Sequence, residues 1–203
     1  DRLKLIRTAL ALQRPKVAEA YIQGLGQNDL DSYEFHYLRL LTLLAQGRPT
    51  KLDAIQQCRK ILEFPEIHAE TCNIYWSLCL DSLDPQFKEE GMAHVTKMAP
   101  HEGKVGLAAL RTLLRYPSQE PSMRSRYARM LWEHPLAQSN DLLLSLNFAF
   151  SGESLPAKPL ADILDKQYGD LDQTELTEVT STLNDLGLHE NAADLLQMPK
   201  IDS

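Results

Sequence analysis

Three prolines at a constant spacing limit what this chain can fold into. Pro65, Pro100 and Pro135 each follow a stretch of apolar residues at helical spacing, and both intervals between them are 35 residues long. Proline cannot continue an α-helix, because it lacks a backbone N–H and clashes with the preceding turn. Each proline therefore marks a helix end, and the constant interval indicates a unit of two helices that recurs along the chain.

The composition favours an all-α fold. The 203 residues include 36 Leu and 18 Ala but only 8 Ile and 4 Val, so straight-chain helix formers outnumber β-branched strand formers. Short connections between helices predict antiparallel hairpins in series. The expected helices, about twelve in number, span residues 2–12, 15–25, 31–46, 51–64, 68–83, 85–98, 102–116, 121–134, 139–151, 159–168, 173–187 and 189–198.

The last hairpin resembles a repeat of a known family. Gly187 lies in the expected turn, the small Ala192 follows five positions later, and the large apolar Leu196 lies four positions further on. Together with the 35-residue interval, this spacing resembles the tetratricopeptide repeat (TPR), which is about 34 residues long. The repeats in the middle of the chain keep the period but depart from the small-residue pattern.

The resemblance implies an α-α superhelix of about six antiparallel hairpins. We expect one TPR-like domain over residues 1–203, with a break, if one exists, at the loop 151–159. The alternative that the sequence leaves open is a compact irregular helical bundle, in which the proline spacing is accidental.

The family also implies where a partner binds. In a superhelix of hairpins, the first helix of each pair lines a concave wall that holds a peptide of a partner protein. Asn73 is the most interesting member of this wall, because similar grooves often hold a ligand's backbone through an Asn side chain. The expected partner-binding residues on the wall are Phe35, Leu38, Asn73, Ser77, Thr112 and Arg115. The resemblance thus implies a non-enzymatic interaction scaffold; the alternatives are a spacer domain of a larger protein and an enzyme without a recognisable motif.

Charge is distributed unevenly along the chain. Residues 1–135 contain 18 Lys or Arg and 16 Asp or Glu, whereas residues 136–203 contain 3 and 12. Arg111 and Arg115 lie four positions apart on one helix face, where both could donate to an acidic peptide. The interpretation we favour is that these arginines are solvated or are complemented by the acidic last third, within one chain or head to tail in a homo-oligomer. Nucleic acid is not an expected partner, because the net charge is -7.

The sequence assigns no catalytic residue, cofactor site or metal site. It contains neither a G-x-x-x-x-G-K-S/T phosphate loop nor a G-x-S-x-G nucleophile motif. Cys58, Cys72 and Cys79 form no C-x-x-C pair and are expected to be reduced, partly buried thiols. No apolar run approaches the ~20 residues of a membrane span. Localisation is not determined: the absence of an N-glycosylation motif favours the cytoplasm or a bacterial origin, and a first residue of Asp1 is compatible with a removed leader.

Overall fold

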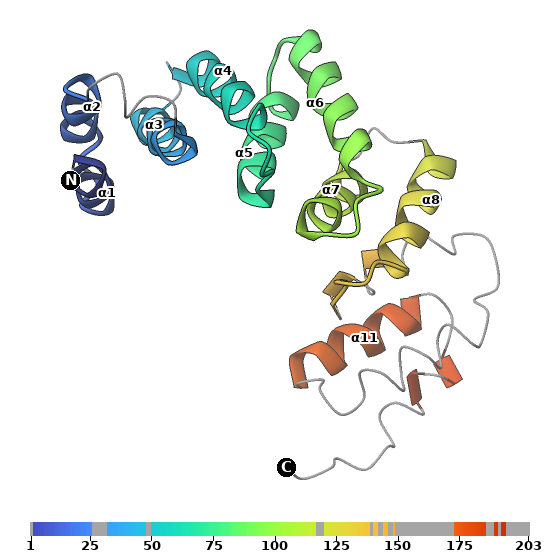
Figure 1. Ribbon diagram of the computed structural model, residues 1–203. Helices are drawn as coiled ribbons and strands as arrows, with labels where there is room; N and C mark the ends of the chain where they lie inside the picture. The colour runs from blue at the N-terminus through green and yellow to red at the C-terminus, as the bar shows by residue number, and fades with distance from the viewer. Residues whose placement is uncertain are drawn as a thin grey trace. The chain divides into compact units, whose positions relative to one another are not determined.

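The described part of the chain consists of α-helices and the connections between them. The computed structural model describes residues 2–25, 32–47, 50–116, 120–138, 140–141, 144–145, 148, 173–185, 189–190 and 192–193. These ranges contain α-helices and no β-strand, which confirms the all-α fold class for them (Figure 1). The chain divides into two compact units, residues 1–98 and 99–203, which we describe separately. The expected loop 151–159 lies outside the described residues, and the single TPR-like domain stays a prediction.

The first unit packs its helices in chain order. Each helix contacts the next one, and α1 also contacts α3 (Figure 1). The described helices of this unit are α1 (Arg2–Ala11), α2 (Pro15–Gln23), α3 (Tyr33–Gln46), α4 (Lys51–Leu62), α5 (Ala69–Leu80) and α6 (Pro85–Met98).

Local sequence signals set several of these helix ends. Pro15 and Pro85 begin α2 and α6, where a missing N–H costs no hydrogen bond. Ser32 caps α3, because its side-chain oxygen accepts a hydrogen bond from the backbone N–H of Phe35 at 3.2 Å. Gly47 ends α3 with a φ of +92°, a conformation that favours glycine. Helix-breaking and helix-capping residues in the sequence therefore predict the helix bounds to within three residues for every helix that the structure describes in full.

The core of the first unit begins between its first three helices. Phe35 and Leu38 of α3 are 2% and 4% exposed and pack against α1 and α2. The other buried members of this cluster are Ile6, Ala9, Ala18 and Ile22. Further along the chain, α5 and α6 approach closely at Gly91, where an added Cβ would lie 2.6 Å from the Cβ of Cys79. Glycine is required at this position because the two helices leave no room for a side chain.

The second unit contains α7 (Lys104–Arg115), α8 (Pro121–Trp132) and α11 (Gln173–Asp185) among its described residues. α7 packs against α8 through a face of leucines, and Leu110, Leu113 and Leu131 are at most 1% exposed. The expected helix 159–168 lies outside the described residues, and the expected helices 139–151 and 189–198 are described only at a few positions. Among the described helices, none has the length and hydropathy of a membrane-spanning segment.

A buried histidine closes the turn after α8. The Nε2 of His134 lies 3.1 Å from the backbone oxygen of His101, and its Nδ1 accepts a hydrogen bond from the backbone N–H of Leu136 at 3.2 Å. Because Nδ1 is an acceptor, the neutral ring carries its proton on Nε2 and donates it to His101. Both ring nitrogens are therefore used within the unit.

Candidate functional site

Helices α3 and α5 share an accessible surface, which we call the α3–α5 face. On α5 its polar side chains are exposed and recur every three or four positions, so they lie along one side of the helix. The apolar residues beside them are half-buried. The α3–α5 face consists of Tyr37, Leu41 and Leu44 from α3 and of Glu70, Asn73, Ile74, Ser77, Leu78 and Asp81 from α5 and its C-cap.

Direct contacts hold the beginnings of the two helices side by side. The hydroxyl of Tyr33 on α3 lies 3.1 Å from the hydroxyl of Thr71 on α5, within hydrogen-bond distance. The Tyr33 ring centroid lies 4.4 Å from that of His68, the residue before α5. These contacts place Tyr37, one turn after Tyr33, beside the first turn of α5.

An apolar cleft of about 230 Å³ lies at the other end of the face. Leu43 and Leu44 of α3 and Ser77, Leu78 and Asp81 of α5 and its end contribute to its walls. The remaining lining residues come from the α3–α4 connection and the start of α4: Gly47, Thr50, Lys51 and Ala54. The cleft therefore combines leucine side chains with a hydroxyl and a carboxylate, as in sites that bind apolar side chains in a fixed orientation.

A more polar cleft of about 390 Å³ lies between α2, α3 and α4. Arg39 and Lys60 line it together with Glu19 and Asp53, so both charge signs are present. The remaining lining residues are Leu43, Gln46, Thr50, Gln56 and Gln57. The balanced charges do not select a ligand of one sign.

Aromatic residues gather where α3 and α5 begin; we call Tyr33, Tyr37, Phe64 and His68 the aromatic cluster. The rings of Tyr33 and Tyr37 stack with centroids 5.9 Å apart and planes 10° apart. Phe64 meets Tyr33 edge-on at 6.1 Å. Burial raises the pKa of Tyr37, and a hydrogen bond to the Glu70 carboxylate raises it further. The cluster thus joins the α3–α5 face through Tyr37 and Glu70.

The sequence shows that α5 lies in an acidic stretch, although charge totals over long segments do not reveal it. Between Lys60 and Lys88 there is no Lys or Arg, and this stretch contains five acidic residues: Glu63, Glu66, Glu70, Asp81 and Asp84. A charge count over residues 1–135 averages this stretch with the basic residues before and after it. A count over windows the size of one hairpin would have identified α5 as acidic.

The opposite side of α5 is buried, and its polar side chains form hydrogen bonds within the first unit. The hydroxyl of Tyr75 donates to the Glu90 carboxylate, which also accepts hydrogen bonds from the guanidinium of Arg59. Trp76 donates its indole N–H to Nδ1 of His94 at 2.8 Å. The hydrogen bond from Arg59 is the main cause that lowers the pKa of Glu90, and desolvation is the main cause that lowers the pKa of His94. These contacts fix the rotation of α5 between α4 and α6, so that Asn73 and Ser77 face outward.

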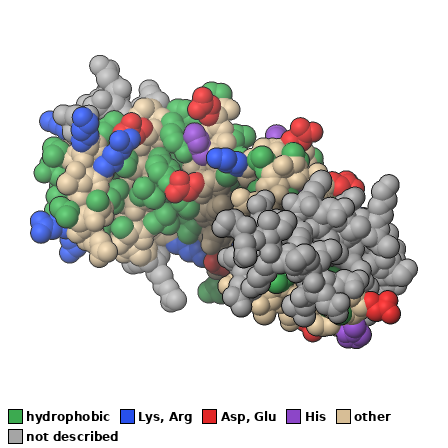
Figure 2. All heavy atoms as spheres, turned by 90° about the horizontal axis from the view of Figure 1, so that it is seen from below, with side chains coloured by type: hydrophobic (Ala, Val, Ile, Leu, Met, Phe, Trp, Pro, Cys, Tyr) green, Lys and Arg blue, Asp and Glu red, His purple; other side chains and the backbone are tan. Residues whose placement is uncertain are grey.

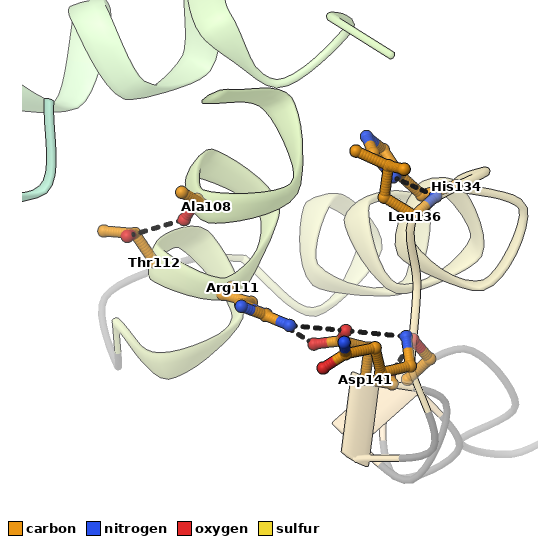
Figure 3. A network of polar contacts seen from close by, with 8 residues as sticks. Ala108, Arg111, Thr112, His134, Leu136 and Asp141 are labelled. Carbon is orange, nitrogen blue, oxygen red and sulfur yellow. Dashed lines mark hydrogen bonds and ion pairs between the residues drawn. The ribbon is translucent and has the colours of Figure 1, made fainter. Parts of the chain in front are cut away.

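In the second unit an arginine expected to bind a partner is paired inside the chain. Arg111 donates from Nε to Oδ1 of Asp141 at 2.6 Å and from its terminal nitrogen to Oδ2 at 2.7 Å (Figure 3). Asp141 is 3% exposed and accepts a further hydrogen bond from the backbone N–H of Gln138 at 2.9 Å. Burial alone would raise the pKa of Asp141, but the hydrogen bonds from Arg111 and Gln138 outweigh it, so the pKa is lowered. Asp141 belongs to the acidic last third, so the pair is of the intramolecular kind expected from the charge distribution.

The structure separates the expected partner-binding residues into three groups. Phe35 and Leu38 lie in the core instead of on an accessible wall, because α1 and α2 cover that side of α3. Asn73 and Ser77 are exposed and lie together on the α3–α5 face.

The third group belongs to α7. Arg111 pairs with Asp141, and the Thr112 hydroxyl donates to the backbone oxygen of Ala108 at 2.9 Å (Figure 3). Arg115 is exposed one turn after Arg111. Among these residues we retain Asn73 and Ser77 in the candidate site, because an accessible surface surrounds them.

The cysteines offer no reactive group at the surface. Cys58, Cys72 and Cys79 are free and buried in the structure. Burial raises the pKa of Cys58 to about 12 and that of Cys72 to about 11, so both remain thiols at neutral pH. Within the described ranges, no three His, Cys, Asp or Glu side chains are arranged to hold a metal ion.

Helices α1 and α2 expose a second apolar surface. Leu5, Leu12, Val17 and Tyr21 are 45%, 61%, 42% and 37% exposed. Figure 2 shows Lys and Arg side chains among apolar ones at the end of the molecule where these helices lie. Among the described residues, nothing indicates what covers this surface.

No model of a known protein family matches the sequence, and neither a curated protein nor a solved structure matches it. The candidate site therefore rests on the geometry of this chain alone.

Proposed function

We propose that this chain is a non-enzymatic protein-interaction module, a TPR-like superhelix that holds a peptide segment of a partner on the α3–α5 face. The observation that carries the proposal is the exposed strip of α5, where Asn73 and Ser77 alternate with the half-buried Ile74 and Leu78. Such a strip offers hydrogen-bonding groups and apolar contacts at the spacing of a bound peptide.

Each part of the strip has a distinct role in this proposal. The Asn73 amide has both donor and acceptor atoms, so it can pair with a backbone C=O and N–H of an extended peptide. Leu44 and Leu78 line the apolar cleft, which accepts an apolar side chain of the peptide. Glu70 and Asp81 are exposed at the two ends of the strip and favour a peptide with basic residues.

Two observations support the superhelical arrangement within this proposal. The helices of the first unit pack in chain order. The prolines at an interval of 35 residues lie near the ends of successive hairpins. An array in which each hairpin contacts its neighbours is the arrangement by which helical repeats build extended binding surfaces.

Selection from a random library of 12-residue peptides displayed on phage tests the function without a known ligand. The affinity of enriched peptides is then measured by fluorescence polarisation for the native chain and for the double variant Asn73→Arg with Ser77→Arg. Both positions are exposed, so the variant should fold normally while two arginines obstruct the strip. We expect enriched peptides to bind the variant at least about 10-fold more weakly, a loss of about 1.4 kcal/mol.

A matched control places the same two arginines elsewhere. Glu89 and Ala93 are exposed, lie four positions apart on α6, and are outside the α3–α5 face. The variant Glu89→Arg with Ala93→Arg should bind the enriched peptides like the native chain. Equal losses in both variants, or no loss in either, would show that the strip is not the binding surface. Failure to enrich any peptide would favour the spacer alternative.

Self-association through the basic middle and the acidic last third stays a prediction. The pair between Arg111 and Asp141 occupies one of the charges on each side of that proposed contact. Sedimentation velocity at low and high salt tests the contact, because a charge-driven oligomer dissociates as salt increases.

A further inference from the structure

The aromatic cluster presents ring surface to solvent beside a carboxylate. Tyr33, Tyr37 and Phe64 are half-buried residues, and the His68 side chain is 46% exposed. Their contacts with each other fix the rings in place, with centroid distances to Tyr33 between 4.4 and 6.1 Å. A preformed group of rings of this kind attracts cations through the negative charge density on the ring faces.

Glu70 carries a negative charge that no described Lys or Arg neutralises. Its side chain is exposed, and within the described ranges no Lys or Arg forms an ion pair with it. The Glu70 carboxylate is among the causes that raise the pKa of Tyr37, so it lies near the Tyr37 hydroxyl. A carboxylate has about four lone-pair positions, so it retains acceptor capacity for an incoming donor.

Other acidic residues near Glu70 strengthen the attraction of a cation to this site. Glu63 and Glu66 are exposed on the chain that leads into α5, and no Lys or Arg occurs between Lys60 and Lys88. By contrast, Glu34 at the start of α3 is paired with Arg7 at 2.8 Å. The region around Glu70 therefore keeps a local excess of negative charge.

We infer that the aromatic end of the α3–α5 face is an anchor for an arginine side chain of the bound peptide, whose guanidinium stacks on the Tyr37 ring and donates to the Glu70 carboxylate. Arginine fits better than lysine because its planar guanidinium combines ring stacking with two parallel hydrogen bonds to a carboxylate. This inference rests on the proposed function, since it names the side chain that the peptide supplies.

A small probe tests the anchor independently of any peptide. Acetyl-arginine amide is titrated into the native chain, and the Tyr33 and Tyr37 ring resonances are followed by NMR. Acetyl-citrulline amide, which has nearly the same shape but no charge, and acetyl-lysine amide serve as comparisons. We expect only the arginine probe to shift these resonances strongly, and we expect Glu70→Gln to weaken its binding about 3- to 10-fold.

Matched variants separate the anchor from general effects. Glu89→Gln removes a charge from an exposed helix position outside the face, and Tyr21→Leu removes an exposed ring from α2. Neither should change binding of the arginine probe, whereas Tyr37→Leu should weaken it. Equal shifts with citrulline, equal binding of lysine, or an unchanged affinity in Glu70→Gln would each overturn the inference.

The enriched peptides supply the second measurement. Replacing the peptide arginine by citrulline should weaken binding to the native chain about 10-fold but should cause little further loss with Glu70→Gln. If peptides bind the strip without needing an arginine, the anchor is wrong and the proposed function stands. If the arginine probe binds with the expected dependence on Glu70 but no peptide is enriched, the arginine site stands, whereas the proposed function and the role of this site in holding a peptide both fail.

Discussion

Helices α5 and α7 use their polar side chains in opposite ways, although the repeat pattern assigns them equivalent places. On α7, Arg111 is matched to the buried Asp141 by two hydrogen bonds inside the unit. On α5, Asn73 and Glu70 face solvent, and no described Lys or Arg pairs with Glu70. The comparison teaches that a charged residue on a predicted binding wall indicates a binding site only if no other residue of the same chain already forms an ion pair with it.

This difference separates stability from binding. Removing one member of a pair whose other member is buried destabilises the fold, because the remaining charge is left desolvated. Exposed groups contribute little to folding, since water satisfies them in both states. Substitutions on α7 should therefore change the free energy of unfolding, and substitutions on α5 should change affinity.

The largest effect is expected for Arg111→Ala. The variant leaves the buried Asp141 carboxylate with only the Gln138 N–H as a donor among the contacts described above, so the free energy of unfolding should fall by about 2–3 kcal/mol. Urea denaturation followed by circular dichroism measures it. Arg126→Ala, at an exposed position of α8, should change stability by less than about 0.5 kcal/mol. Similar values for both variants would remove the distinction between α7 and α5.

The pair should also make stability depend on pH. Because the folded pKa of Asp141 lies below its ordinary value, its stabilising contribution is fully present above the unfolded pKa of about 3.9. The contribution is lost as the pH falls through the lower folded pKa. The stability difference between the native chain and Asp141→Asn, about 1–2 kcal/mol at neutral pH, should therefore shrink in acid. A difference that stays constant from pH 7 to pH 2 would exclude this role for Asp141.

A smaller effect is expected on the buried side of α5. Nδ1 of His94 accepts the indole N–H of Trp76, so protonation of that nitrogen breaks the hydrogen bond. Burial lowers the folded pKa of His94, so its contribution, about 1 kcal/mol, is present above an unfolded pKa of about 6.5 and is lost as the pH falls through the folded value. Chemical denaturation at a series of pH values, followed by Trp fluorescence, should show this loss. His94→Gln keeps an acceptor and should not show it.

The smallest effect on folding is expected for Asn73→Ala. Asn73 is exposed within α5, and alanine has the higher helix propensity, so the free energy of unfolding should stay equal or rise by about 0.5 kcal/mol. The affinity for enriched peptides should nevertheless fall about 5-fold, as expected for one hydrogen-bonding group. Thermal denaturation and fluorescence polarisation measure the two quantities. Loss of stability with unchanged affinity would reverse the comparison between α5 and α7.

Helix positions were predictable from sequence, because helix starts and ends depend on residues close to them in the chain, such as proline. Pro85 predicts the start of α6, and the proline at position 100 limits its end, so the expected range 85–98 agrees with the observed one. The end of α4 at Leu62 comes two residues before the expected end at 64, because the residue before Pro65 disfavours helical conformation.

The side of each helix that stays accessible was harder to predict. α3 carries apolar residues almost all round, so its sequence does not show that α1 and α2 cover Phe35 and Leu38. The pair between Arg111 and Asp141 could not be predicted from the sequence either, because 30 residues separate the two. A segment-wide charge balance predicts that opposite charges meet, but tertiary packing decides which residues pair.

The three buried thiols have a practical consequence. All cysteines of the chain lie in the first unit, on α4 and α5, and each is completely buried. A thiol-reactive label can reach them only when this unit opens, so the labelling rate measures the opening equilibrium of the first unit alone. The chain thus carries its own reporter: labelling that slows when a peptide is added would show that the peptide stabilises the unit that contains α5.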